Sequence, residues 1–157
     1  MSYSGKLNQA LQHIQLWRAE NKCIVFTNGC FDLLHPGHID YLSKARALGD
    51  VLIIGLNDDA SIRRLKGPDR PINPLADRAI MLSALKFVDL VVPFSEDTPL
   101  KLITAVKPDI LVKGGDYQPN DIVGATEVRA SGGKVIVMPF VDGHSSTSLI
   151  QRIQQLA

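Results

Sequence analysis

Five short, almost uninterrupted apolar runs recur along this 157-residue chain, and segments with helical spacing separate them. Continuous apolar runs of this length are typical of parallel strands that are buried on both faces of a sheet. We predict strands at residues 23–27, 51–56, 88–92, 109–112 and 135–138. Strands that alternate with helices predict a Rossmann-like α/β fold, with a doubly wound parallel sheet of about five strands.

The segments between these runs supply the helices. Leu7, Leu11, Ile14 and Trp17 follow helical spacing, which predicts a first helix over residues 4–20 within an N-terminal segment 1–21. Gly49 is expected to close the second helix as its C-cap. The length fits a single domain spanning 1–157. Helices are predicted at 36–48, 73–86, 98–106, 121–131 and 146–156.

Composition limits the function classes. Hydrophobic residues make up 45% of the chain, charged residues 21%, and the formal net charge is +1. This balance argues against a bulk nucleic-acid or membrane-surface binder. The two cysteines do not suggest a disulfide framework, which favours a reducing cytoplasm. We expect neither a signal peptide nor a membrane-spanning segment.

The segment Thr27–His38 follows the first predicted strand and carries the strongest functional signal. Pro36 fits the first position of a helix, which puts His35 at the N-cap and His38 in the first turn. Residues three apart share a helical face, so both imidazoles can point the same way. Gly37 leaves room for a ligand. Because a helix N-terminus attracts anions, the segment predicts a site for nucleotide phosphates.

A zinc site is the main alternative for this segment, because Cys30 and Asp32 lie close to His35 and His38. Structural zinc sites, however, usually draw paired ligands from two separate places in the sequence. The other cysteine, Cys23, lies within a predicted strand. Phosphate binding is therefore favoured, and the absence of a Gly-x-Gly-x-x-Gly fingerprint argues against NAD or FAD.

Three further polar segments lie at the expected ligand end of the sheet. The cation-rich stretch 63–71 is interpreted as a loop, either a solvated connection or a lid that brings Lys66 and Arg70 over phosphates. The stretch 113–117 carries two glycines, which indicate a plain turn or a close approach of backbone to a ligand. The stretch 142–148 offers ordinary N-caps or a second phosphate site. Two helix N-termini would suit a triphosphate.

These motifs carry a resemblance. His35-Pro36-Gly37-His38, the late Ser146-Thr147 and Arg78 make the chain similar to the cytidylyltransferase-like nucleotidyltransferases. Further stretches resemble the branch of heptose 1-phosphate adenylyltransferases, of which this chain would be the stand-alone form; in many bacteria that domain is fused to a sugar kinase. They are residues 27–32, 64–67, 70–74, 112–117 and 142–147.

Two departures weigh against the related glycerol-3-phosphate cytidylyltransferases. That family carries an arginine shortly before Ser-Thr, where this chain has Val141-Asp142-Gly143-His144. It also carries two acidic residues after the glycine that follows the fourth strand, where this chain has only Asp116. A glycerol-3-phosphate cytidylyltransferase and a non-catalytic nucleotide-binding module stay as alternatives.

The resemblance implies transfer of AMP from ATP to D-glycero-β-D-manno-heptose 1-phosphate, giving ADP-heptose and pyrophosphate for lipopolysaccharide core synthesis. It implies Mg²⁺ held by phosphate oxygens with no protein ligand named, and a homodimer, with neither nucleic acid nor membrane as partner. The residues expected to be catalytic are His35, His38, Lys66 and Arg78. Those expected to bind the nucleotide are Thr27, Asn28, Gly29, Cys30, Phe31, Gly37, Lys113, Gly114, Gly115, Asp116, Ser146 and Thr147. Those expected to bind the second substrate are Asp32 and Arg70.

Overall fold

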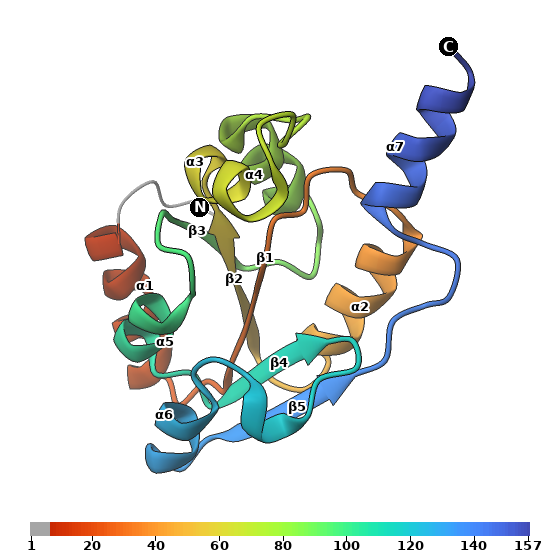
Figure 1. The fold of residues 1–157 in the computed structure, drawn as a ribbon. Coiled ribbons are helices and arrows are strands. Elements are labelled where there is room, and N and C mark those ends of the chain that lie inside the picture. Colours follow the sequence, from red (N-terminus) through yellow and green to blue (C-terminus); the bar gives the residue numbers. More distant parts are fainter. Residues whose placement is uncertain (1–6) are drawn as a thin grey trace.

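A parallel sheet with helices on both faces forms the body of the protein (Figure 1). We describe residues 7–157 from a computed structural model. In chain order the elements are α1 (Leu7–Ala19), β1 (Ile24–Gly29), α2 (Pro36–Arg46), β2 (Val51–Asn57), α3 (Asp59–Lys66), α4 (Leu75–Ser83), β3 (Leu90–Phe94), α5 (Leu100–Val106), β4 (Ile110–Gly114), the 3-10 turn η1 (Pro119–Asp121), α6 (Ala125–Ala130), β5 (Lys134–Met138) and α7 (Ser146–Gln155).

The strand order creates a switch point at the centre of the sheet. The five strands lie in the order β3-β2-β1-β4-β5, and every neighbouring pair is parallel. The chain therefore winds from β1 towards one edge and then returns to build the other edge from β4. In such folds ligands bind outside the carboxyl ends of the strands at this reversal. The ends of β1 and β4 are thus the expected position of a site.

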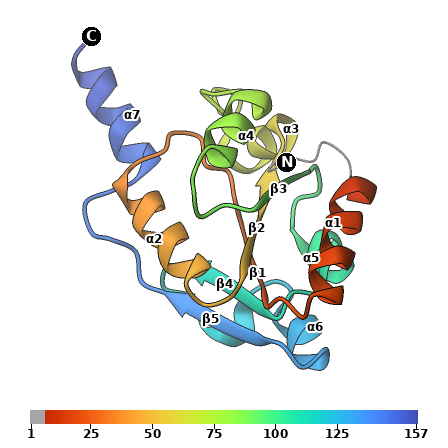
Figure 2. The same cartoon turned by 180° about the vertical axis from the view of Figure 1, so that it is seen from behind.

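Alternation along the strands divides the core into two layers. Ile24 and Phe26 of β1 pack with α1, α5 and α6 on one face, whereas Val25 packs with α2 and α4 on the other. Figures 1 and 2 show these two helical layers from opposite sides. Because both faces are covered, the strands are apolar at almost every position, which confirms the predicted doubly wound α/β fold.

The predicted elements are found with shifted ends. β1 and β4 extend further than predicted, to Gly29 and Gly114, which carries both strands up to the site. α2 ends at Arg46 with Ala47 as a right-handed C-cap, so the prediction of Gly49 as its C-cap is wrong. α4 begins at Leu75 and α6 at Ala125, each later than predicted. The predicted helix residues 4–6 lie outside the described part of the chain.

The cation-rich stretch was wrongly interpreted as a loop throughout. Its first half belongs to α3, which ends at Lys66, and only the segment from Gly67 onward is irregular. Asp58 caps this helix by accepting a hydrogen bond from the Ser61 N–H at 2.8 Å. Gly67 then ends it with a φ of 102°, a conformation that favours glycine.

α7 stands apart from the two helical layers. It leaves the body beside the start of α2 and points outward in both ribbon views (Figures 1 and 2). No residue of α7 is buried. Only its N-terminus is therefore available to contribute to a site at the centre of the sheet.

Candidate active site

Two stacked histidines lie at the N-terminus of α2, as the sequence predicted. His35 is the N-cap with an extended φ of −144°, and Pro36 opens the helix. The rings of His35 and His38 stack with their centroids 3.8 Å apart and their planes 23° apart. Spacing by three therefore brings both imidazoles onto one face of the helix, beside the backbone N–H groups of its first turn.

The surroundings of both histidines lower their pKa values and so favour the neutral imidazole. Burial lowers the pKa of His38 to about 4, and the nearby charges of His35 and Lys66 add to this effect. Burial, followed by the charge of His144, also lowers the pKa of His35. The Nδ1 atoms of both rings are buried and have no hydrogen-bond partner within the described residues. A buried polar atom without a hydrogen-bond partner costs free energy. An anionic ligand would offset this cost, because its negative charge favours an imidazole that is protonated or donates an N–H.

The ring of Phe31 packs against the ring of His38. Its ring lies 5.1 Å from that of His38, at an angle of 58°. A Cβ on Gly29 would lie only 2.9 Å from Cε2 of Phe31, so the glycine leaves room for this ring. Phe31 itself adopts a left-handed φ of 46°, which is unusual for an aromatic residue. Gly29 and Phe31 thus position His38 as well as line the site.

The N-terminus of α7 is fastened against the same turn. Ser146 Oγ donates a hydrogen bond of 2.9 Å to the carbonyl of Leu33 in the loop after β1. Ser145 is the N-cap, and its Oγ accepts from the Ser148 N–H at 2.9 Å. A Cβ on Gly37 would lie 3.1 Å from Cβ of His144, so Gly37 makes room for this approach. Two helix N-termini therefore meet at one point, as expected for a site that binds several phosphates.

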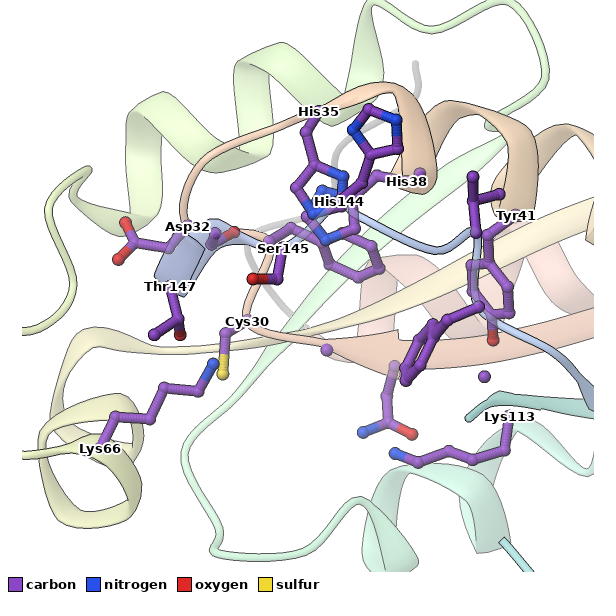
Figure 3. Close-up of a pocket in the computed structure, with 18 of the residues that line it drawn as sticks. Cys30, Asp32, His35, His38, Tyr41, Lys66, Lys113, His144, Ser145 and Thr147 are labelled. Carbon is purple, nitrogen blue, oxygen red and sulfur yellow. The ribbon is translucent and has the colours of Figure 1, made fainter. Parts of the chain in front are cut away.

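These elements enclose a cavity of about 380 Å³ at the carboxyl ends of β1 and β4, a size typical of small-molecule sites. Most of the predicted site residues line it, and Figure 3 shows a selection. The predicted residues in its lining are Asn28, Gly29, Cys30, Phe31, Asp32, His35, Gly37, His38, Lys66, Lys113, Gly114, Ser146 and Thr147.

Lys66 brings a cation to the cavity from the end of α3. In Figure 3 its side chain extends towards Cys30 and Thr147. It enters the lining although it belongs to a helix and not to the predicted loop. The positive charge of Lys66 shares this cavity with the two helix N-termini, which increases the positive potential there.

Asp32 binds the segment that follows α3 through several hydrogen bonds. Its carboxylate is 1% exposed and accepts hydrogen bonds from Arg70 Nε at 2.7 Å and from the backbone N–H groups of Ile72 and Asn73 at 2.9 Å. Burial alone would raise the pKa of Asp32, but these bonds together hold it below its usual value. Arg70 forms this ion pair with Asp32 and does not line the cavity. Its Nη2 atom is buried and has no hydrogen-bond partner within the described residues.

Arg78 does not reach the cavity. It is fully buried, and its guanidinium donates to the carbonyls of Asn73, Cys30 and Asn57 at 2.8–2.9 Å. A further bond of 2.7 Å runs to Asp59. This arginine therefore connects the loop after β1, the end of β2, and the segment before α4, and it fixes the backbone around Cys30.

The remaining predicted residues also lie outside the lining. Thr27 is buried, and its hydroxyl lies 2.6 Å from that of Tyr41. Gly115 is buried, and Asp116 is exposed beyond the cavity. Several residues that line it were not predicted as site residues. They are Tyr41, Tyr117, Phe140, Val141, His144 and Ser145.

Only some of these additional residues left a signal in the sequence. His144 and Ser145 lie in the stretch 142–148, which marked a second helix N-terminus, and the ring of His144 stacks 6.2 Å from that of His35. The aromatic residues left none, because an isolated Tyr or Phe is more often part of a core. Lys113 lies beside one of them, with Nζ 5.5 Å from the ring centroid of Tyr117.

The described residues do not gather a set of metal ligands. No group of three His, Cys, Asp or Glu side chains among residues 7–157 is arranged to hold a metal ion. Asp32 lines the same cavity as the histidines, and its carboxylate is already saturated by Arg70 and backbone N–H groups. A zinc site of the kind considered for the histidine segment thus lacks its ligands in this part of the chain. Within the same residues, no helix is long and apolar enough to cross a membrane.

Comparison with known proteins identifies relatives that are longer than this chain. The chain is 57% identical over 147 residues to the bifunctional protein HldE of Nitrosococcus oceani, a match that covers 94% of the chain and 31% of that protein. It is 60% identical over 137 residues to the bifunctional protein HldE of Halorhodospira halophila, covering 87% of the chain and 29% of the relative. The chain thus spans about a third of the length of these curated relatives.

Solved structures share the fold. The crystal structure of the lipopolysaccharide core biosynthesis protein from Thermoplasma volcanium superposes with a TM-score of 0.61 at 32% identity, covering 76% of this chain and 97% of that one. Pantoate-beta-alanine ligase from Francisella tularensis gives a TM-score of 0.64 at 20% identity, covering 98% of this chain and 77% of that one. The second likeness concerns the fold alone.

The comparison with protein families agrees with the motifs at the two helix N-termini. Residues 26–152 match the family described as cytidylyltransferase-like. This span runs from β1 to α7 and includes every element that contributes to the cavity. Since the match covers most of the chain, this protein belongs to the cytidylyltransferase-like family.

Proposed function

We propose that this chain is an adenylyltransferase that transfers AMP from ATP to D-glycero-β-D-manno-heptose 1-phosphate, giving ADP-heptose and pyrophosphate. The observation that carries the proposal is the convergence of two helix N-termini, two stacked imidazoles and Lys66 on one cavity. That arrangement suits a triphosphate. The choice of heptose and adenine rests on the motif resemblance. A relative's description as a lipopolysaccharide core biosynthesis protein supports the same pathway.

The reaction needs positioning more than proton transfer. A phosphate oxygen of the sugar phosphate attacks the α-phosphorus of ATP, the bond from that phosphorus to the oxygen bridging to the β-phosphorus breaks, and pyrophosphate leaves. A phosphate monoester is largely dianionic near neutral pH, so the nucleophile needs no general base. Catalysis then depends on alignment and on stabilising the charge that develops on the α-phosphate and the leaving group.

Each group at the cavity has a role in this scheme. His35 and His38 donate N–H groups to the oxygens around the reacting phosphorus. Lys66 neutralises charge on the departing pyrophosphate. The first turn of α7, with Ser146 and Thr147, holds the β- and γ-phosphates, because free N–H groups and hydroxyls at a helix start suit anionic oxygens.

Two residues expected to contact substrates are assigned an indirect role. The guanidinium of Arg78 is fully buried and donates four hydrogen bonds to protein acceptors, so it positions the backbone of Cys30 beside the nucleotide. Asp32 positions the segment that carries Arg70. The NH2 group of Arg70 has no protein partner within the described residues, and the acceptor phosphate would supply one after a small opening of this segment.

Mg²⁺ would enter with the nucleotide and not through a protein site. The described residues do not fit a dedicated metal site, since they gather no three ligating side chains and Asp32 is saturated. No step of the scheme therefore depends on a protein-bound metal. A cytoplasmic location, a homodimer and the single-domain organisation over 1–157 stay predictions from the sequence and its resemblance.

Pyrophosphate release tests the proposal. The enzyme should be assayed with ATP and with CTP, each against heptose 1-phosphate and glycerol 3-phosphate. We expect turnover with ATP and heptose 1-phosphate, and a preference for ATP of at least about tenfold in kcat/KM. Greater turnover of CTP with glycerol 3-phosphate would replace the proposed substrates. Nucleotide binding without turnover of any pair would identify a binding module.

A further inference from the structure

A large apolar side chain stands exposed at the cavity. Phe140 follows β5, lines the cavity, and is 69% exposed. One side of its ring lies directly against the glycine pair at the end of β4. A Cβ on Gly114 would lie 2.8 Å from Cε1 of Phe140, and a Cβ on Gly115 would lie 2.8 Å from Cε2. No other residue type could stand at these two positions with the ring where it is.

The cavity has a phosphate end and an aromatic end. Figure 3 shows Lys66 and Thr147 on one side of the histidines and Tyr41 and Lys113 on the other. The second side holds the end of β4, against which Phe140 packs. A nucleotide whose phosphates lie at the helix N-termini would therefore extend its nucleoside towards this aromatic end.

Among the aromatic residues there, Phe140 has a face available to a ligand. Tyr41 is largely buried, and its hydroxyl is held by Thr27 at 2.6 Å. Tyr117 already has Lys113 near its ring. Phe140 instead rests on backbone and leaves much of its apolar surface open to water, which is unfavourable until something planar and apolar covers it.

We propose that Phe140 is the residue on which the base of the nucleotide stacks, and that Gly114 is a glycine because it supports the ring. Gly115 packs against the same ring, and its φ of 111° favours glycine as well. This inference rests on the proposed function, of which it names the base-binding residue. It changes the part expected of the glycine pair, which supports the base through Phe140 rather than reading it directly. A purine covers more of the ring than a pyrimidine, so stacking favours ATP over CTP.

Nucleotide affinity of Phe140→Ala tests this inference. Binding of a non-hydrolysable ATP analogue and of tripolyphosphate should be measured by calorimetry on the full chain. We expect the affinity for the ATP analogue to fall about ten- to hundredfold, the range of a lost base–aromatic contact. Affinity for tripolyphosphate should be unchanged, because this ligand has no base. Phe140→Trp should retain analogue binding.

Two further variants keep the result interpretable. Phe140→Leu preserves apolar bulk over the glycines and should fold, yet it should lose analogue affinity as Phe140→Ala does. Ile80→Ala removes a similarly exposed apolar side chain on α4, outside the cavity lining, and should change neither affinity. Wild-type analogue affinity in both Phe140→Ala and Phe140→Leu would overturn the stacking role alone. Failure of the wild-type protein to bind the analogue would overturn the proposed function as well.

The supporting role of the glycines has its own test. Gly114→Ala places a methyl group 2.8 Å from Phe140 and 3.1 Å from Cε2 of Tyr41, so we expect it to lower the melting temperature. In a Phe140→Ala background, part of that loss should disappear, because one of the two obstructing rings is gone. Equal losses in both backgrounds would contradict the packing of Phe140 on the glycine pair.

Discussion

Replacing Arg78 separates a structural role from a catalytic one. The family resemblance placed this arginine among the catalytic residues, whereas its guanidinium is fully buried and donates four hydrogen bonds within the protein. Arg78→Met keeps much of the side-chain length and removes every donor. The main consequence should therefore be a loss of stability, accompanied by a displaced loop at Cys30.

The size of this loss follows from the acceptors left behind. The carbonyls of Asn73, Cys30 and Asn57 would lose a partner, and a buried acceptor without one costs about 1–3 kcal/mol. Asp59 would lose its ion pair, but its side chain is 30% exposed and water can replace part of that bond. Water that enters beside the smaller group offsets some of the total, so we expect destabilisation of about 3–5 kcal/mol.

Urea and thermal denaturation followed by circular dichroism measure this effect. For a chain of 157 residues, the expected loss lowers the melting temperature by about 6–20 °C. Arg152→Met on the exposed α7 serves as the control and should change stability by less than about 0.5 kcal/mol. An Arg78→Met variant that melts like the wild type but turns over far more slowly would refute the reasoning, because Arg78 would then act on the substrate.

Three further predictions concern the histidines and the carboxylate beside them. His35→Ala and His38→Ala should each lower kcat by about 10²–10³ in steady-state pyrophosphate release while the fold persists. Because burial lowers the pKa of His38 to about 4 in the folded state, the unfolded chain takes up its proton first, and stability should fall as the pH drops from about 6.5 towards 4. Urea titrations should show a smaller fall for His38→Gln. Asp32→Asn should cost about 3–5 kcal/mol in the same titrations, because it leaves Arg70 without its counter-ion.

The fold could be predicted because burial on both faces leaves a direct record in the sequence. Strands covered by helices on each side must be apolar throughout, and β2 is buried at all of its residues. α3 was not predicted, because little of this helix is buried. Only Ser61 and Ile62 of this helix are buried, and most of its residues are polar, so few apolar positions indicate a helix in the sequence. The other feature that indicates this helix is the N-cap residue Asp58, and a cap residue alone predicts a helix only weakly.

The phosphate end of the cavity could be predicted because its groups are local. Pro36 fixes the start of a helix, and the spacing of His35 and His38 then determines where both rings lie. The aromatic end depends on contacts between segments far apart in the chain. Nothing in the sequence near Phe140 indicates that its ring lies against Gly114, 26 residues earlier.

Arg78 shows why residue type alone does not assign a role. An arginine on a helix near the carboxyl end of a sheet can reach a phosphate or can join backbone carbonyls, and both uses rely on the same donors. The choice is made by burial, which depends on how α4 packs over the loop after β1. The two uses remain coupled, because a guanidinium that fixes the carbonyl of Cys30 also fixes the turn that leads to His35. Replacing Arg78 should therefore destabilise this turn and displace the imidazoles of His35 and His38 at the same time.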